Sequence, residues 1–97
     1  MMNFDDFSSS LAAPTPPDNL PVLLKALWHD GKGEWEQAHE IAQSREGDPA
    51  FDRIHAYLHR VEGDEWNANY WYRRAGMAMF KGSLKDEWNA LVLHHLG

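Results

Sequence analysis

Apolar residues recur every three or four positions along most of the chain, which is the spacing of one face of an amphipathic helix. Capping residues precede several of these stretches and glycines follow them, as with Asp48-Pro49 before the third stretch and Gly63 after it. No stretch alternates apolar and polar residues as a half-buried strand does. The pattern predicts an all-α fold with helices at residues 19–30, 34–44, 49–62 and 65–75, and a fifth from residue 84 onward.

Residues 1–17 differ in composition from the rest of the chain. Serines and prolines there disfavour helices, and the first nineteen residues hold three aspartates but no lysine or arginine. Phe4, Phe7 and Leu11 could dock on the remainder, but the segment has no core pattern of its own. We therefore expect a flexible, acidic and proline-rich tail at residues 1–17 and a helical bundle at residues 18–97.

The predicted helices contain an internal repeat with an offset of thirty residues (56 − 26 = 30). The pairs that coincide at this offset are Ala26 with Ala56, His29 with His59, Gly33 with Gly63, Glu34 with Asp64, and Ala38 with Ala68. Small residues let two helices approach, a glycine turns the chain, and an acid caps the next helix. The repeat predicts two helical hairpins of the same kind.

The second hairpin resembles the tetratricopeptide repeat and its Sel1-like relatives. The residues that carry the resemblance are Ala56, Gly63, Asp64, Ala68, Tyr72 and Ala75. They match the small residue of the family's first helix, its turn, and the small–aromatic–small pattern of its second helix. The resemblance covers roughly residues 20–76 and implies two tetratricopeptide-like hairpins that bind other proteins. The last predicted helix would then be a C-terminal capping helix, because such arrays need their open end covered.

The match to the family is incomplete. The spacing of thirty is shorter than the usual 34, and His29 and His59 stand where the family commonly has a tyrosine. The first hairpin has Ala42 in place of the aromatic residue. Trp28-His29 and residues 57–60 are also similar to segments of small bacterial proteins, which implies a bacterial source and no particular activity.

Composition and charge exclude several classes of protein. The 97 residues include no cysteine, so disulfides and cysteine-ligated zinc are excluded, and a net charge of −6 is unlike the basic surface of a nucleic-acid-binding protein. No apolar run approaches the ~20 residues that span a bilayer, and the start of the chain lacks the features of a secretory leader. We expect a cytoplasmic protein with no nucleic-acid or membrane partner and, since no cofactor-binding motif is visible, no cofactor.

Histidines supply the first candidate site. His55 and His59 are four residues apart on one helical face and could hold one metal ion, to which Asp52 could add a carboxylate and His29 a further ring. The same face carries three large apolar residues, so we favour a buried structural role for these histidines. With His39 they also offer acid–base groups, but no nucleophile motif accompanies them, and an enzyme is the least favoured class.

Aromatic and basic residues of the third and fourth predicted helices supply the second candidate site. The residues that could bind a partner or a ligand are Arg53, Tyr57, Arg60, Trp66, Tyr70, Arg73 and Arg74. Aromatic side chains and arginines are typical anchors of protein interfaces. Twelve aromatic residues (five Trp, three Tyr and four Phe) exceed what so small a bundle easily hides, so a homodimer is also expected.

The sequence therefore favours a protein-interaction module of the tetratricopeptide-like type, without catalysis. The alternative is a small-molecule or metal-binding protein that uses the His/Trp/Tyr cluster of the third and fourth predicted helices. The positions of His55, His59, Trp66 and Tyr70 distinguish the two, because a sealed core favours packing and an open arrangement favours a ligand.

Overall fold

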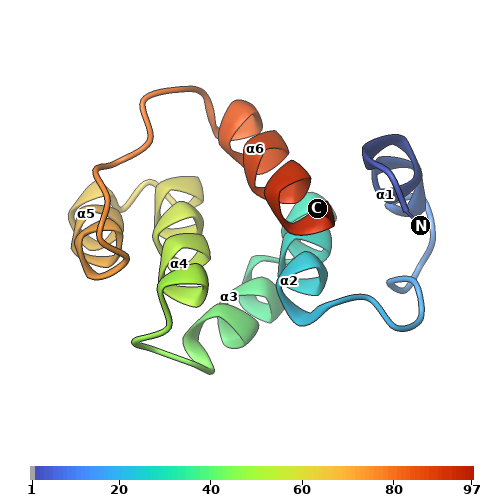
Figure 1. Ribbon diagram of the computed structural model, residues 1–97, viewed down its shortest axis with the longest axis horizontal. Coiled ribbons are helices and arrows are strands. Elements are labelled where there is room, and N and C mark those ends of the chain that lie inside the picture. Colours follow the sequence, from blue (N-terminus) through green and yellow to red (C-terminus); the bar gives the residue numbers. More distant parts are fainter. Residues whose placement is uncertain (1) are drawn as a thin grey trace.

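The computed structural model describes residues 2–97, which form helices joined by turns (Figure 1). The helices of this part of the chain are α1 (Phe4–Ser10), α2 (Val22–Gly31), α3 (Trp35–Gln43), α4 (Pro49–Val61), α5 (Glu65–Arg74) and α6 (Leu84–Leu96). Residues 2–97 contain no strand, and the all-α class is confirmed. Within the same residues, every helix is too short or too polar to cross a membrane.

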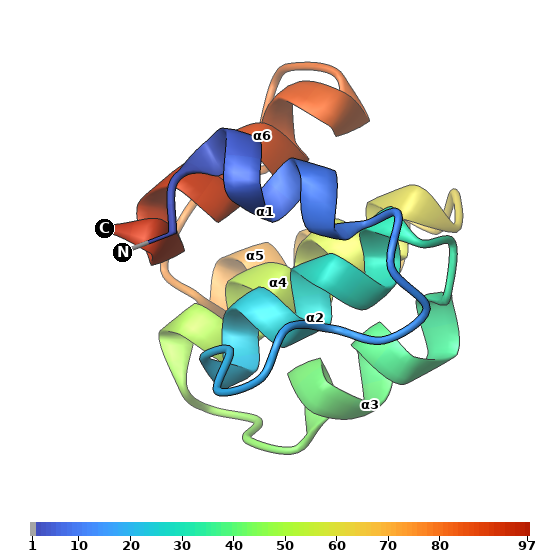
Figure 2. The ribbon, with the colours of Figure 1, turned by 90° about the vertical axis from the view of Figure 1, so that its right-hand side faces the viewer.

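The helices form two hairpins with α6 lying across them. α2 packs most extensively on α3, and α4 on α5, while α3 packs on α4 and so joins the hairpins. α6 contacts both α2 and α4, and α1 packs on α6 at the end of the molecule opposite α5 (Figure 1, Figure 2). The helix α4 is therefore the centre of the fold, with α2, α3, α5 and α6 around it.

The turns inside the two hairpins are built alike. Gly33 and Gly63 adopt φ values of 79° and 85°, which residues with a Cβ rarely adopt. The next residue in each turn donates its backbone N–H to a histidine carbonyl, from Glu34 to His29 and from Asp64 to His59, at 2.9 Å in both cases. The four alanines of the thirty-residue repeat are all fully buried. The repeat therefore corresponds to equivalent local structure, whereas its relation to the tetratricopeptide family stays a prediction.

Residues 4–10, expected to belong to a flexible tail, instead form α1 and take part in the core. Asn3 caps this helix by accepting the backbone N–H of Asp6, and Asp6 accepts that of Asn3 in return. Phe7 is fully buried, with its ring 5.9 Å from that of Trp88 on α6. The Trp28 indole donates to the Ser10 hydroxyl at 3.1 Å. These contacts supply the partner surface that a helix of seven residues needs.

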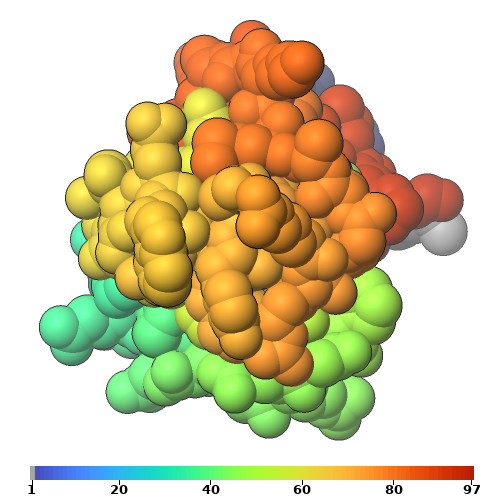
Figure 3. All heavy atoms as spheres, turned by 90° about the vertical axis from the view of Figure 1, so that its left-hand side faces the viewer, coloured from blue at the N-terminus to red at the C-terminus, as the bar shows by residue number. Residues whose placement is uncertain are grey.

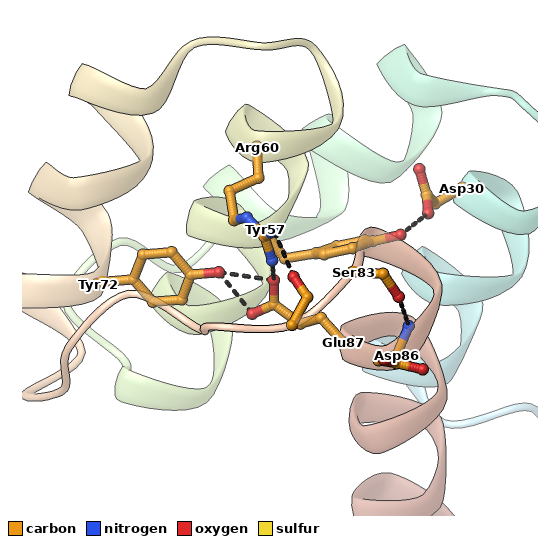
Figure 4. A network of polar contacts seen from close by, with 8 residues as sticks. Asp30, Tyr57, Arg60, Tyr72, Ser83, Asp86 and Glu87 are labelled. Carbon is orange, nitrogen blue, oxygen red and sulfur yellow. Dashed lines mark hydrogen bonds and ion pairs between the residues drawn. The ribbon is translucent and has the colours of Figure 1, made fainter.

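A buried carboxylate ties α6 to the second hairpin (Figure 4). Glu87 is fully buried and accepts hydrogen bonds from the Tyr72 hydroxyl on α5 and, at 2.6 Å, from Arg60 Nη1 on α4. Arg60 Nη2 donates to the carbonyl of Gly82 at 2.8 Å. We call Arg60, Tyr72 and Glu87 the Glu87 network. Each of its charged groups has a partner, as buried charge requires.

Candidate metal centre

Three histidines from two helices meet between the hairpins. His39 lies on α3, and His55 and His59 lie on α4. One ring nitrogen of each lies within 4.8 Å of the other two, and Nε2 of His39 is 3.0 Å from Nε2 of His55. We call these residues the tri-histidine cluster. His55 and His59 are buried and His39 is partly exposed, so the cluster reaches the surface on the α3 side.

The local sequence explains why the rings converge. His55 and His59 are one turn apart on α4, and their rings stack with centroids 4.9 Å apart. His39 directly follows Ala38, one of two fully buried alanines of α3, where the helix can approach its neighbours closely. The contact between α3 and α4 then carries His39 to a centroid distance of 4.7 Å from His55.

Two tryptophans flank the cluster. The ring of Trp35, one turn before His39 on α3, stacks on His39 at 4.6 Å and 12°. The ring of Trp71 on α5 stacks on His55 at 4.0 Å and 20°. The Trp35 indole donates to the carbonyl of Leu58 at 2.7 Å, which fixes this ring against α4. The two tryptophan rings restrict the rotation of the His39 and His55 imidazoles, so the orientations of these two rings are partly fixed before any ligand binds.

The surroundings of His39 and His55 lower the pKa values of both rings and so favour their neutral forms at neutral pH. Burial lowers the pKa of His55 to about 4, with further contributions from the neighbouring histidines and Arg74. Burial and the neighbouring His59 also lower the pKa of His39, against an opposite effect of nearby glutamates. A neutral imidazole has a free lone pair, which is the form that binds metal ions.

Hydrogen bonding inside the cluster is incomplete. His39 and His55 face each other through Nε2 atoms, and two neutral rings in this arrangement share a single proton. Nδ1 of His55 is buried and has no hydrogen-bond partner within the described residues. In either tautomer a buried donor or acceptor of His55 is unpaired, at a cost of about 1–3 kcal/mol. A metal ion held by the two Nε2 atoms would replace the shared proton and would leave Nδ1 of His55 unpaired.

The third ring is oriented by a carboxylate. Glu62, at the C-terminal end of α4, places Oε1 2.6 Å from Nδ1 of His59. A proton on Nδ1, donated to Glu62, leaves the lone pair on Nε2. A second group of potential ligands, formed by His59, Glu62 and Asp64, shares this ring with the cluster. Asp64 is the N-cap of α5, and its two carboxylate oxygens accept hydrogen bonds from the Asn67 backbone and side chain.

The structure brings together only part of the predicted histidine site. His29 lies apart from the two groups of potential ligands found in residues 2–97, and its Nδ1 is 2.8 Å from Oε1 of Glu34. Asp52 is fully buried and accepts the backbone N–H of Gly47 through both oxygens, so its carboxylate holds the turn before α4. His39 takes their place in the cluster. No sequence signal identifies His39, because the contact between α3 and α4 that brings it to His55 is tertiary.

The predicted partner-binding residues divide into two sets. Tyr57 is buried and donates its hydroxyl to Asp30 at 2.6 Å, and Arg60 belongs to the Glu87 network, so the polar ends of both are engaged internally (Figure 4). Arg53 is half-buried, with no hydrogen-bond partner for Nε in the described residues. The remaining residues, Trp66, Tyr70, Arg73 and Arg74, are exposed on α5.

The exposed residues of α5 form an aromatic and basic strip. Trp66 and Tyr70 are 77% and 46% exposed, and their rings lie parallel with centroids 6.4 Å apart. The Arg74 guanidinium lies 5.9 Å from the Tyr70 ring centroid and 4.9 Å from that of Trp71. Figure 3 shows this end of the molecule, where α5 and the segment after it are outermost. We call Trp66, Tyr70, Arg73 and Arg74 the α5 strip.

Comparison with protein-family models, with curated proteins and with solved structures found no match. The tri-histidine cluster and the α5 strip are the two surfaces of the described residues whose chemistry points to a function.

Proposed function

We propose that the protein binds a divalent transition-metal ion through His39, His55 and His59. The observation that carries the proposal is the convergence of three imidazole nitrogens within 4.8 Å, two of them on buried rings of the central helix. Zinc–nitrogen bonds of 2.0–2.1 Å in tetrahedral geometry place ligand nitrogens about 3.3 Å apart. The separation of 3.0 Å between His39 and His55 is close to that value, so small ring movements would suffice.

The donor set selects the class of ion. Three neutral imidazoles suit zinc, copper(II), nickel or cobalt, whereas magnesium and calcium prefer oxygen donors. The cluster lies in acidic surroundings, since Glu40, Glu46 and Glu62 all act on His39 electrostatically. A net charge of −6 also attracts cations to the molecule. These features support a cation of charge two at a site whose own ligands are uncharged.

Metal binding would stabilise the fold, because the ligands come from both hairpins. An ion that binds only the folded chain adds about 2.7 kcal/mol at a hundredfold excess over its dissociation constant. For a domain of this size we expect the melting temperature to rise by roughly 10 °C.

The test is a zinc titration of the chelator-treated protein, followed by calorimetry and thermal melting. We expect one ion per chain and a higher melting temperature in the wild type, and neither in His39→Gln, whose altered side chain is partly exposed. His94→Ala on α6 is the matched control, since His94 is exposed and outside the cluster. If zinc, nickel and copper all fail to bind, or if His39→Gln binds them as the wild type does, the proposal is refuted.

The α5 strip favours a second function, which is binding to another protein. An exposed tryptophan stacked on an exposed tyrosine beside two arginines has the composition of an interface anchor. A tetratricopeptide-like role and a homodimer both fit this surface. Sedimentation at rising concentration tests the homodimer: Trp66→Ser should weaken self-association, and a wild type that stays monomeric at millimolar concentration contradicts it.

A further inference from the structure

We infer that the tri-histidine centre keeps one coordination position open and takes a small exogenous donor ligand there, so that it is an exchangeable Lewis-acid site and not a closed structural one. This inference rests on the proposed metal binding. It goes further, because a closed site with a fourth protein ligand would bind the ion equally well and leave it inert.

The protein offers three donors and no evident fourth. Within residues 2–97, the group around His39 and His55 contains only one further potential ligand of the His, Cys, Asp or Glu type, which is His59. The nearest carboxylates are engaged elsewhere, since Glu62 bonds Nδ1 of His59 and Asp64 caps α5. The sequence contains no cysteine that could complete the sphere. Structural zinc sites use four protein ligands, and sites with three leave a position for water or substrate.

The most exposed member of the cluster is His39, on the α3 side. His55 and His59 are buried, and the stacked rings of Trp35 and Trp71 cover two flanks. The partly exposed ring of His39 borders a surface depression of about 240 Å³. The depression is lined by Trp35, Glu36, His39, Glu40 and Gln43. His39 is the member of the cluster that lines this depression, so we expect solvent and small solutes to reach a bound ion past His39.

The depression restricts the class of ligand. Its volume lies below the usual range of pockets for drug-sized molecules, so it suits ligands of a few atoms. Its rim carries the carboxylates of Glu36 and Glu40, which disfavour anions approaching from solvent and leave neutral donors unaffected. Three uncharged ligands leave the full charge of the ion in place, and such an ion lowers the pKa of a bound water. The expected ligands are water and other small neutral lone-pair donors, with small anions bound more weakly.

The experiment uses the cobalt(II)-loaded wild-type protein, whose visible absorption reports coordination geometry. In protein that carries one cobalt ion per chain, we expect added imidazole, a neutral donor, to change this spectrum until the change saturates. We expect azide to change the spectrum in the same way with lower affinity. A cobalt spectrum that forms fully but does not respond to either probe shows a closed site and overturns the inference while the proposed function survives. A protein that binds no cobalt, zinc, nickel or copper overturns both.

A rim variant tests the route of entry. In Glu36→Gln/Glu40→Gln, the two carboxylates at the depression are replaced by neutral amides of similar size. We expect azide to bind the cobalt-loaded variant several-fold more tightly, with imidazole affinity unchanged, because only the anion senses the lost charge. A glutamate-to-glutamine substitution at one exposed position away from the depression, Glu65→Gln, is the control and should change neither affinity. Equal azide affinity in the rim variant and the wild type would refute entry past His39.

Discussion

Single residues decide where the two similar hairpins differ in chemistry. At the offset of thirty residues, Lys25 aligns with His55 and His39 aligns with Asn69. Of the three cluster histidines, only His59 has a histidine, His29, at the equivalent position of the other hairpin. His29 accordingly pairs with Glu34 in isolation, whereas His59 joins two further rings. His59 is buried, as a packing role alone would require. Its hydrogen-bond partner Glu62 lies at the end of the same helix, α4, and not on a neighbouring helix. A structural position of the repeat has thus become a potential ligand in one copy.

The depressed pKa of His55 predicts a stability that depends on pH in the chelator-treated protein. The unfolded ring protonates below pH 6.5, while the folded ring stays neutral until about pH 4. The unfolded state therefore binds more protons in this window, and stability is lost as the pH falls from 6.5 towards 4, by up to ~3 kcal/mol. Urea unfolding should show a loss of ~1 kcal/mol between pH 7.5 and 5.5 from this ring alone. The variant His55→Gln should lose clearly less over the same interval, and equal losses would contradict the assignment.

Glu62 should act as a positioning residue for the metal. Its carboxylate holds Nδ1 of His59 at 2.6 Å, and removal of such an outer partner typically weakens metal affinity by about 10–100-fold. Glu62→Gln should therefore bind zinc at least about tenfold more weakly by calorimetry, with a small change in urea stability because the side chain is exposed. Glu65→Gln, another exposed glutamate nearby, serves as the control. Unchanged affinity in Glu62→Gln would show that His59 does not bind through Nε2.

At the scale of helices, sequence signals predicted the positions of most helices along the chain but not the contacts between helices. Helices α2 to α6 carry apolar periodicity, α4 to α6 begin at side-chain caps, and glycines follow α2, α4 and α5. These signals sufficed for the approximate bounds of the five helices. The helix α1 lacks such a pattern, since its seven residues hold three serines and two aspartates and it depends on one buried ring packed on α6. The sequence likewise contains no signal for the contact of α3 with α4. His39 therefore became a candidate ligand only when this contact was known.

The role of α1 in the core predicts a cost for removing its anchor. Phe7 is fully buried and contacts Trp88 with its ring, so Phe7→Ala leaves a cavity between α1 and α6. We expect a loss of about 3 kcal/mol in urea unfolding. Ser9→Ala, an exposed change in the same helix, should be close to neutral. If Phe7→Ala melts like the wild type, residues 1–17 behave as the flexible tail that composition suggests.

At the scale of the whole molecule, α4 carries two polar clusters that lead to different neighbours. His55 and His59 connect it to α3 and, through Trp71, to α5, while Arg60 and Tyr57 connect it to α6 and α2. The tri-histidine cluster is the proposed metal site, whereas in the Glu87 network the fully buried carboxylate is paired with the guanidinium of Arg60. Stability and metal binding are thus assigned to separate parts of one central helix.

This separation predicts that the Glu87 network can be weakened without loss of the metal site. Glu87→Gln keeps the volume of the side chain but removes the charge that balances Arg60, and an uncompensated buried partner costs about 3 kcal/mol. Tyr72 also loses a charged acceptor for its hydroxyl. Urea unfolding should show the loss, and Asp86→Asn, an exposed acid one residue earlier on α6, should show little.

Zinc affinity of the folded variant, measured at low temperature by calorimetry, should stay within about twofold of the wild type, as expected for independent sites. A parallel fall in zinc affinity would mean that α6 holds α4 and α3 in register, and the two clusters would then form one cooperative unit.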